Sequence, residues 1–270
     1  MQTQPPLDLS RVFTLEPHGP DTYVAESPRY SWGRMYGGLV VAQALWAATQ
    51  TVREEHSVHS LHAYFILGGE LGEPVRYEVD RVRNGRSFTT RRVVARQSAG
   101  AILTLECSFQ RFEEGAESQS FVMPAGVPAP ESLERISDAG IQRCDVAGAR
   151  THPGSLVWAR YPLALGADAR LHYCALAYLS DMNPMDAISN SRAGGPPSGG
   201  PGALDWMGAS LDHAVWFHRP VRADDWLLMD LTGHGLIRTR GLATGHVFDR
   251  AGVHIATIAQ EGLLRPKKSS

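Results

Sequence analysis

The stretch GGLVVAQALWAATQTV, from Gly37 to Val52, decides the fold. Small and apolar residues occupy nearly every side of a helix over this stretch, and the interruptions include Gln43 and two threonines. A helix without a polar face is expected to be buried, because a surface helix keeps one face for water. A second helical stretch runs from Ala169 to Met182. Each helix therefore needs another element to surround it.

Four β-rich runs follow each helix and are separated by turn residues. After the first helix they cover Val58 to Leu67, Val75 to Val82, Phe88 to Gln97 and Ala101 to Phe112, with turns at Gly68-Gly69, Asn84-Gly85 and Ala99-Gly100. After the second they cover Ser210 to Phe217, Trp226 to Leu231, Ile237 to Phe248 and Val253 to Leu264, with turns at Gly233 to Gly235 and at Asp249 with Gly252. Short runs joined by tight turns predict antiparallel meanders. A sheet that wraps around a buried helix is the hotdog arrangement.

A weak internal repeat relates the two halves. A shift of 152 positions brings Tyr64-Phe65 onto Trp216-Phe217, and the order of elements is the same in both halves. The sequence thus predicts an α+β double hotdog, two tandem copies of a long antiparallel sheet wrapped around a central helix. We expect a first repeat over residues 1–115, a linker and variable segment over 116–150, and a second repeat over 151–270. The Gly/Pro/Ser-rich stretch 189–202 is predicted to form no helix or strand.

Composition excludes several classes of protein. The 26 Lys and Arg residues nearly balance 28 Asp and Glu residues, so no basic field favours nucleic acid as a partner. The three cysteines, Cys107, Cys144 and Cys174, have no metal-ligand spacing and are expected to be buried in a reducing compartment. The chain has neither a run of 18 apolar residues nor a signal-peptide pattern at its start. We therefore expect a cytoplasmic protein that does not span a membrane.

Four segments resemble the type II acyl-CoA thioesterases, the double-hotdog enzymes of bacteria and peroxisomes. They are YGGLVVAQAL (36–45), VHSLHAYF (58–65), GRSFTTRRV (85–93), and DHAVWFHRP (212–220) with IAQEG (258–262). The resemblance implies hydrolysis of acyl-CoA to free CoA and a carboxylic acid in fatty acid or other lipid metabolism. It also implies no metal or organic cofactor and a homodimer or homotetramer. Where the family commonly has Arg-Pro-Gly, this chain has Leu67-Gly68-Gly69.

The resemblance further implies a catalytic trio that holds a water molecule against the thioester carbonyl. By position the trio is Asp181, Ser210, where the family more often has Thr, and Gln260. An Asp at the C-terminal end of a helix opposes the helix dipole, so Asp181 is badly placed for stability alone. It would act best as a general base if burial raised its pKa. For Ser210 the alternative is a turn or cap residue, and for Gln260 a solvent-facing position.

Backbone N–H groups of Gly37 and Gly38, at the start of the first helix, are the expected oxyanion-binding and substrate-binding groups. The alternative is that these glycines only permit a tight turn. Arginines on equivalent strands of the two halves (Arg86, Arg91, Arg92, Arg238 and Arg240) are expected mainly on a solvated outer face, with some available to CoA phosphates. His59, His62, His213 and His218 are interpreted as hydrogen-bonded strand residues, because the chain lacks a Gly-x-Ser-x-Gly elbow. A small catalytic possibility stays with His62 and His213.

Two other functions compete with hydrolysis. A non-catalytic acyl-CoA-binding protein would keep the fold and lose the water site. Enoyl-CoA hydratases share the double hotdog but need a His five residues after an Asp, and the fifth residue after Asp181 is Asp186. Hydration is therefore the weaker alternative.

Overall fold

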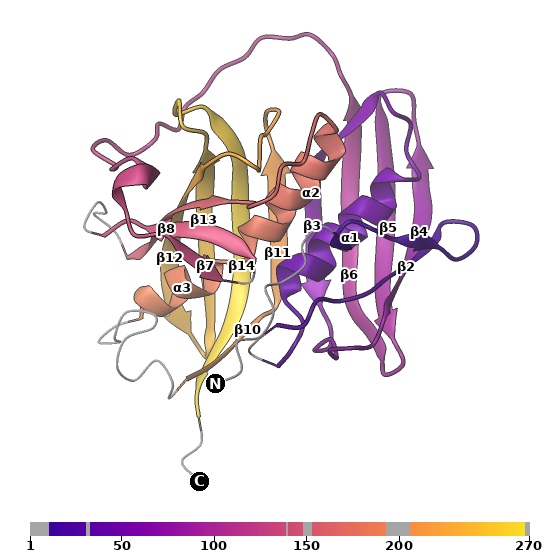
Figure 1. Cartoon of the computed structure of the whole chain (residues 1–270), viewed down its shortest axis with the longest axis horizontal. Coiled ribbons are helices and arrows are strands. Elements are labelled where there is room, and N and C mark those ends of the chain that lie inside the picture. Colours follow the sequence, from indigo (N-terminus) through magenta and orange to yellow (C-terminus); the bar gives the residue numbers. More distant parts are fainter. Residues whose placement is uncertain (1–10, 31–32, 139, 148–152, 193–205, 268–270) are drawn as a thin grey trace.

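One antiparallel sheet forms the framework of the molecule (Figure 1). The structure is a computed structural model that describes residues 11–30, 33–138, 140–147, 153–192 and 206–267. Within these residues fourteen strands pair, and every pair is antiparallel. The chain thus has the large antiparallel sheet that its two meanders predicted.

The first half contributes β1 (Glu16–Pro17), β2 (Thr22–Ala25), α1 (Gly37–Thr49), β3 (His56–Phe65), β4 (Val75–Asn84), β5 (Phe88–Gln97) and β6 (Gly100–Arg111). The following segment holds the 3₁₀ turn η2 (Pro130–Ser132), β7 (Ile136–Asp138) and β8 (Ile141–Asp145). The remainder contains β9 (Gly154–Arg160), α2 (Ala169–Ser180), α3 (Pro184–Asn190), β10 (Trp206–Ser210), β11 (Asp212–Phe217), β12 (Leu227–Ile237), β13 (Arg240–Phe248) and β14 (His254–Pro266). Both expected helices begin at the predicted residue, and each ends two or three residues early.

The order of strands is mirrored about the centre of the sheet. It runs β1-β2-β4-β5-β6-β3-β11-β14-β13-β12-β9-β8-β7, so β3 and β11 meet in the middle, and β10 adds to β14. The pairing of Val79 with Val93 in β4 and β5 returns, 152 positions later, as the pairing of Leu231 with Gly245 in β12 and β13. The halves therefore share strand order and, at this hairpin, register.

The two long helices lie side by side against one face of the sheet (Figure 1). In α1 every residue except Gly37 and Trp46 is buried, as the lack of a polar face predicted. Gln43 is a buried polar residue of this helix, and its amide is hydrogen-bonded at both ends. Its Nε2 donates to the carbonyl of Val12 at 2.8 Å, and its Oε1 accepts from the Tyr77 hydroxyl at 2.7 Å. Such pairing is what a buried amide requires.

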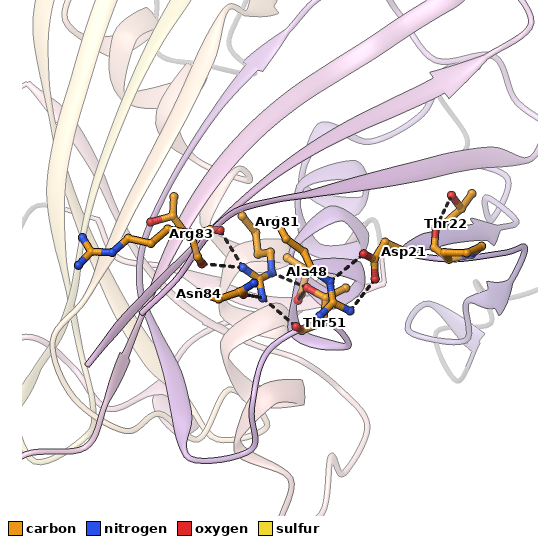
Figure 2. Close-up of polar contacts among 10 residues, drawn as sticks. Asp21, Thr22, Ala48, Thr51, Arg81, Arg83 and Asn84 are labelled. Atoms are coloured by element: carbon orange, nitrogen blue, oxygen red, sulfur yellow. Dashed lines mark hydrogen bonds and ion pairs between the residues drawn. The ribbon is translucent and has the colours of Figure 1, made fainter. Parts of the chain in front are cut away.

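A buried arginine, Arg91, holds the C-terminal end of α1. Figure 2 labels Ala48, Thr51 and Asn84, which lie around it. The guanidinium of Arg91 donates to Oγ1 and the carbonyl oxygen of Thr51, at 2.6 and 2.8 Å, and to Oδ1 of Asn84 at 2.7 Å. Thr51 in turn donates to the carbonyl of Ala48 in the last turn of the helix, at 2.8 Å. A cation at this end also complements the helix dipole. The expectation of a solvated position was wrong for Arg91, which is 1% exposed, although it holds for Arg92.

One predicted turn in the second half was placed wrongly. The turn expected at Gly233 to Gly235 is an irregularity inside β12, where the register shifts between Gly233 and Leu236. The chain reverses instead at Arg238 and Thr239, whose φ angles of 49° and 69° are those of a two-residue hairpin turn. Gly233 packs too closely on α3 for any side chain, which explains the glycine without a turn.

The stretch predicted to lack structure, 189–202, begins inside α3, which ends at Asn190. Its residues 193–202 lie outside the described residues. The expected strand at Ser210 is divided in two, because Ser210 ends β10 and β11 begins at Asp212.

The segment between the halves crosses from β6 to the far part of the sheet (Figure 1). There it covers a second apolar cluster on the face opposite α2, formed by Cys144, Val146, Leu156, Trp158, Trp226, Leu228 and Phe248. Met123, Val127 and Leu133 pack onto this cluster, and the Trp158 indole donates to the carbonyl of Pro128 at 2.9 Å. The segment thus seals the outer face of the second half. Among the described helices, none is long and apolar enough to cross a membrane.

Candidate active site

A cavity of about 640 Å³ lies where the N-terminal end of α1 approaches the C-terminal end of α2. Its apolar walls come from both halves of the chain: Met35, Val40, Phe65, Ile66, Leu67 and Ile102 from the first, Met182, Met185 and Leu211 from the second. Asp181, Ser210, Arg34, Arg143 and Asp186 supply the charged and hydroxyl groups. A cavity that combines apolar walls with several charged and hydroxyl groups can hold a small molecule that has both an apolar and a polar part.

Asp181 is the C-cap of α2 and is 8% exposed. Burial raises the pKa of its carboxyl from 3.8 to about 7, against the lowering effects of Gln260, the Gly38 N–H, Ser210 and the charge of Arg34. Partial negative charge at the C-terminal end of a helix also disfavours a carboxylate. The carboxyl is therefore poised to gain or lose a proton near neutral pH.

Ser210 lies beside this carboxyl at the end of β10. Its hydroxyl is 3.4 Å from Oδ1 of Asp181 and accepts a hydrogen bond of 2.8 Å from Nε2 of Gln260. Gln260, on β14, is fully buried behind Ser210, so the solvent-facing alternative was wrong for it. The structure thus brings together the three residues that the sequence singled out, with Asp181 and Ser210 on the cavity wall.

The two glycines approach the same carboxyl from α1. The backbone N–H of Gly38 is hydrogen-bonded to Asp181, while Gly37 lines the cavity. A Cβ at Gly37 would lie 2.7 Å from Oδ2 of Asp181 and 2.9 Å from the Phe65 ring, and one at Gly38 would lie 2.5 Å from the carbonyl of Tyr178. Only glycine lets the first turn of α1 come this close to the end of α2.

A further pair of buried side chains lies behind Gln260. His213 is fully buried, with Nδ1 2.6 Å from Oε1 of Gln260 and Nε2 2.7 Å from Oγ of Ser180. Burial lowers the pKa of His213 to about 4, so the ring is neutral at neutral pH. His62 lies elsewhere, half-exposed and paired with Asp212 at 2.9 Å. The interpretation of the histidines as hydrogen-bonded strand residues also fits His59 on β3, which contacts Ser108. His218 is hydrogen-bonded to Thr257 but lies just beyond the end of β11.

Two arginines at the cavity were not predicted from the sequence. Arg34 precedes the Tyr36-Gly37-Gly38 turn, and Arg143 lies on β8, in the segment to which no element was assigned. The arginines proposed from the strands lie elsewhere: Arg92 pairs with Asp80 and Arg240 with Glu261 on exposed surfaces. The only sign in the sequence that Arg34 could reach the site is its position three residues before Gly37, where the first helix was predicted to begin.

Two family models match this chain. Residues 26–110 match the family model of the acyl-CoA thioesterase N-terminal domain, and residues 113–264 match that of the acyl-CoA thioesterase C-terminal domain. The chain belongs to the acyl-CoA thioesterase family. Its resemblance to type II members, first seen in four short segments, therefore extends over nearly the whole sequence.

Relatives in this thioesterase family match along almost their full length. Acyl-coenzyme A thioesterase 8 of Mus musculus is 33% identical over 296 residues, covering 96% of this chain and 89% of the mouse protein. Acyl-CoA thioesterase 2 of Haemophilus influenzae is 30% identical over 288 residues, covering 96% and 97%.

A solved structure supports the hotdog fold. The acyl-CoA thioesterase II TesB2 of Mycobacterium marinum superposes with a TM-score of 0.83 at 33% identity, covering 97% of this chain and 98% of that one. A hot dog fold protein from Alicyclobacillus acidocaldarius, at 18% identity and a TM-score of 0.78, shares the fold.

Proposed function

We propose that this chain hydrolyses acyl-CoA thioesters to free CoA and a carboxylic acid, with Asp181 as the general base. The observation that carries the proposal is a carboxyl group with a pKa of about 7 beside a hydroxyl, both on the wall of a cavity lined by apolar and charged residues. A base with a pKa near the working pH is efficient, since it is ionised often enough to act and still basic enough to take a proton.

The water molecule would be held between Asp181 and Ser210. Asp181 takes one of its protons as the oxygen attacks the thioester carbonyl carbon, and the carbonyl oxygen becomes an oxyanion. At the first position of α1 the N–H of Gly37 has no partner within the helix, so it is our candidate for stabilising that oxyanion. The tetrahedral intermediate then breaks its C–S bond. The thiolate leaves with the proton from Asp181, which balances the reaction.

Gln260 would act without contacting the thioester. Its Nε2 donates to Ser210 at 2.8 Å, and its side chain is also hydrogen-bonded to Asp181. It therefore orients both groups while remaining shielded from the cavity. A neutral amide suits this position because it adds no charge that competes for the proton.

The larger architecture supports the same reading. We infer two tandem hotdog repeats, with a linker over 116–150, from the mirrored strand order and the shared register at a shift of 152 positions.

The three cysteines are free and buried, which fits a reducing compartment and a cytoplasmic role in lipid metabolism. A homodimer or homotetramer is the expected assembly, because the edges of an open sheet tend to pair with another chain.

Free thiol release from a series of acyl-CoAs, from short to long chain, tests the proposal. Wild-type protein should release CoA, and Asp181→Asn should lower kcat by about 10²-fold or more through loss of the base. Asp80→Asn, on the exposed outer face, is the matched control and should retain full activity. Binding of acyl-CoA with no thiol release from any member of the series would favour the non-catalytic binding protein instead.

A further inference from the structure

The buried groups behind the candidate site form one continuous chain of hydrogen bonds. It runs from Asp181 through Ser210, Gln260 and His213 to Ser180, with donor–acceptor distances of 3.4, 2.8, 2.6 and 2.7 Å. Gln260, His213 and Ser180 are all fully buried. Water therefore cannot replace a missing partner, and each group depends on its neighbours for its orientation.

The hydrogen bonds from Ser180 to Asp181 all run in one direction. An amide donates only through its nitrogen, so the bond from Nε2 of Gln260 to Ser210 leaves Oε1 facing His213. Because Oε1 only accepts, Nδ1 of His213 carries the ring hydrogen. A neutral imidazole then has a bare Nε2, which accepts from the hydroxyl of Ser180.

The reverse direction would turn the wrong group toward Asp181. The Ser180 hydroxyl also lies 2.9 Å from the carbonyl of Ala177, so it has a second acceptor within reach. If it donated there, His213 could place its hydrogen on Nε2, and Gln260 could rotate its amide by half a turn. The amide oxygen would then face Ser210 and the carboxylate, where it repels negative charge instead of donating to it.

We propose that His213, held by Ser180, is a positioning residue that keeps the NH₂ group of Gln260 turned toward Ser210 and Asp181. The proposal rests on the proposed function and extends it by one layer of residues. His213 does not touch substrate. It acts by selecting one of the two orientations of an amide that would otherwise be nearly symmetric in shape.

A nucleophilic role for the Ser180–His213 pair does not fit the geometry. Ser180 is 0% exposed, and it lies in the last turn of α2 behind Asp181. It is not among the residues that line the cavity. Its hydroxyl therefore cannot reach a thioester carbon, and the pair serves orientation.

Three variants separate positioning from packing. His213→Phe keeps a flat ring of similar size and removes the donor, so we expect kcat to fall roughly 10- to 100-fold with little change in KM. His213→Asn places an amide N–H near the former Nδ1 and should restore most of kcat. Ser180→Ala frees the tautomer of His213 and should give an intermediate loss. His218→Asn, which changes an exposed histidine beyond the same strand, is the control.

The pH profile gives a readout that loss of packing alone would not change. The hydrogen bond from Gln260 lowers the pKa of Asp181, so turning the amide should raise it. We expect the acid limb of kcat/KM to move to higher pH in His213→Phe and to return in His213→Asn. If His213→Phe has the same acid limb and the same kcat as wild type, His213 has no positioning role. Hydrolysis by the wild-type protein would still support the proposed function.

The ring nitrogens can also be examined without any activity. Nitrogen NMR of the wild-type chain at pH 7 should show His213 neutral with its hydrogen on Nδ1, and Ser180→Ala should disturb that state. A hydrogen on Nε2 in the wild type would overturn the inference even if the protein hydrolysed no thioester.

Discussion

At the scale of single residues, Asp181 is placed where a carboxylate is least stable. It is buried, and it lies at the negative end of α2, so folding raises its pKa from 3.8 to about 7. Between these two values the folded state binds more protons than the unfolded state, so the free energy of unfolding falls as the pH rises through this window. The site is therefore maintained at a cost in stability, as is common where function requires strain.

Asp181→Asn should consequently stabilise the protein while inactivating it. At pH 8 we expect the free energy of unfolding to increase by roughly 1–3 kcal/mol. This is less than the full rise of the Asp181 pKa from 3.8 to about 7 would give, because the amide loses part of the hydrogen bonding. The gain should shrink as the pH is lowered toward 4, where the folded wild-type carboxyl is protonated and is therefore as neutral as the amide of the variant. Urea unfolding at pH 8 and pH 5 measures the difference, with the exposed Asp80→Asn as control. An equal effect of Asp181→Asn at both pH values would contradict the raised pKa.

The same carboxyl should govern the rate. If Asp181 is the base, kcat/KM increases with pH and levels off above about pH 7, the pKa of its carboxyl. Initial rates of thiol release across the range from pH 5 to 9 show this limb. The residual activity of Asp181→Asn should lack it. A profile that is flat between pH 6 and 8 in the wild type would assign the proton transfer to another group.

Residues differed in how far the sequence could predict them. The place of Asp181 at the end of α2 was predictable from its motif and the predicted helix boundary, and its catalytic role stays a prediction. Arg91 was not, since strand alternation alone does not say which face of a strand meets a helix end. His213 was recognised as hydrogen-bonded, but its partners come from α2 and β14, 33 and 47 positions away in sequence, and no local pattern reveals them.

At the scale of elements, α1 is fixed at both ends by residues from other elements. Its N-terminal turn donates to Asp181 of α2, and its C-terminal end is capped by Arg91 of β5. Its small and apolar composition made this helix, and its burial, predictable from the sequence. The hairpin between β12 and β13 was harder to predict, because Arg238 and Thr239 adopt positive φ angles without a glycine, while Gly233 and Gly241 pack against α3.

Arg91→Met should therefore weaken the anchoring of α1. Removing the guanidinium leaves the carbonyl and hydroxyl oxygens of the buried Thr51 without their donor, which costs about 2–4 kcal/mol of unfolding free energy. Arg92→Gln changes the neighbouring residue on the exposed face, where its pair with Asp80 contributes little, and should stay within about 0.5 kcal/mol of wild type. Chemical denaturation of both variants measures the contrast. Equal losses would mean that the hydrogen bonds of Arg91 do not set the stability of this region.

At the scale of the whole molecule, the two halves share one sheet and one core. β3 and β11 pair from Tyr64 opposite Asp212 to Ser60 opposite Trp216, and the main apolar cluster contains residues of both halves and both long helices. The candidate site depends on this union, since Asp181 comes from the second half while Gly37 and Gly38 come from the first. The internal repeat was visible in the sequence, but the junction was not, because pairing between β3 and β11 leaves no signature in either strand alone.

A shared core predicts that damage to one half is felt in the other. Arg91→Met alters the first half only, yet we expect it to lower the protection of amides in β5 and in β13 by the same free energy, because both strands should exchange through one global opening. Native-state hydrogen exchange of wild type and variant, compared strand by strand, measures this. The physical reason is that opening either half would expose the apolar face of α1 or α2 and break the central β3–β11 ladder, so neither half gains by opening alone. Loss of protection confined to β4, β5 and β6 would instead make the halves separate folding units, and the site at their junction would then depend on docking between them.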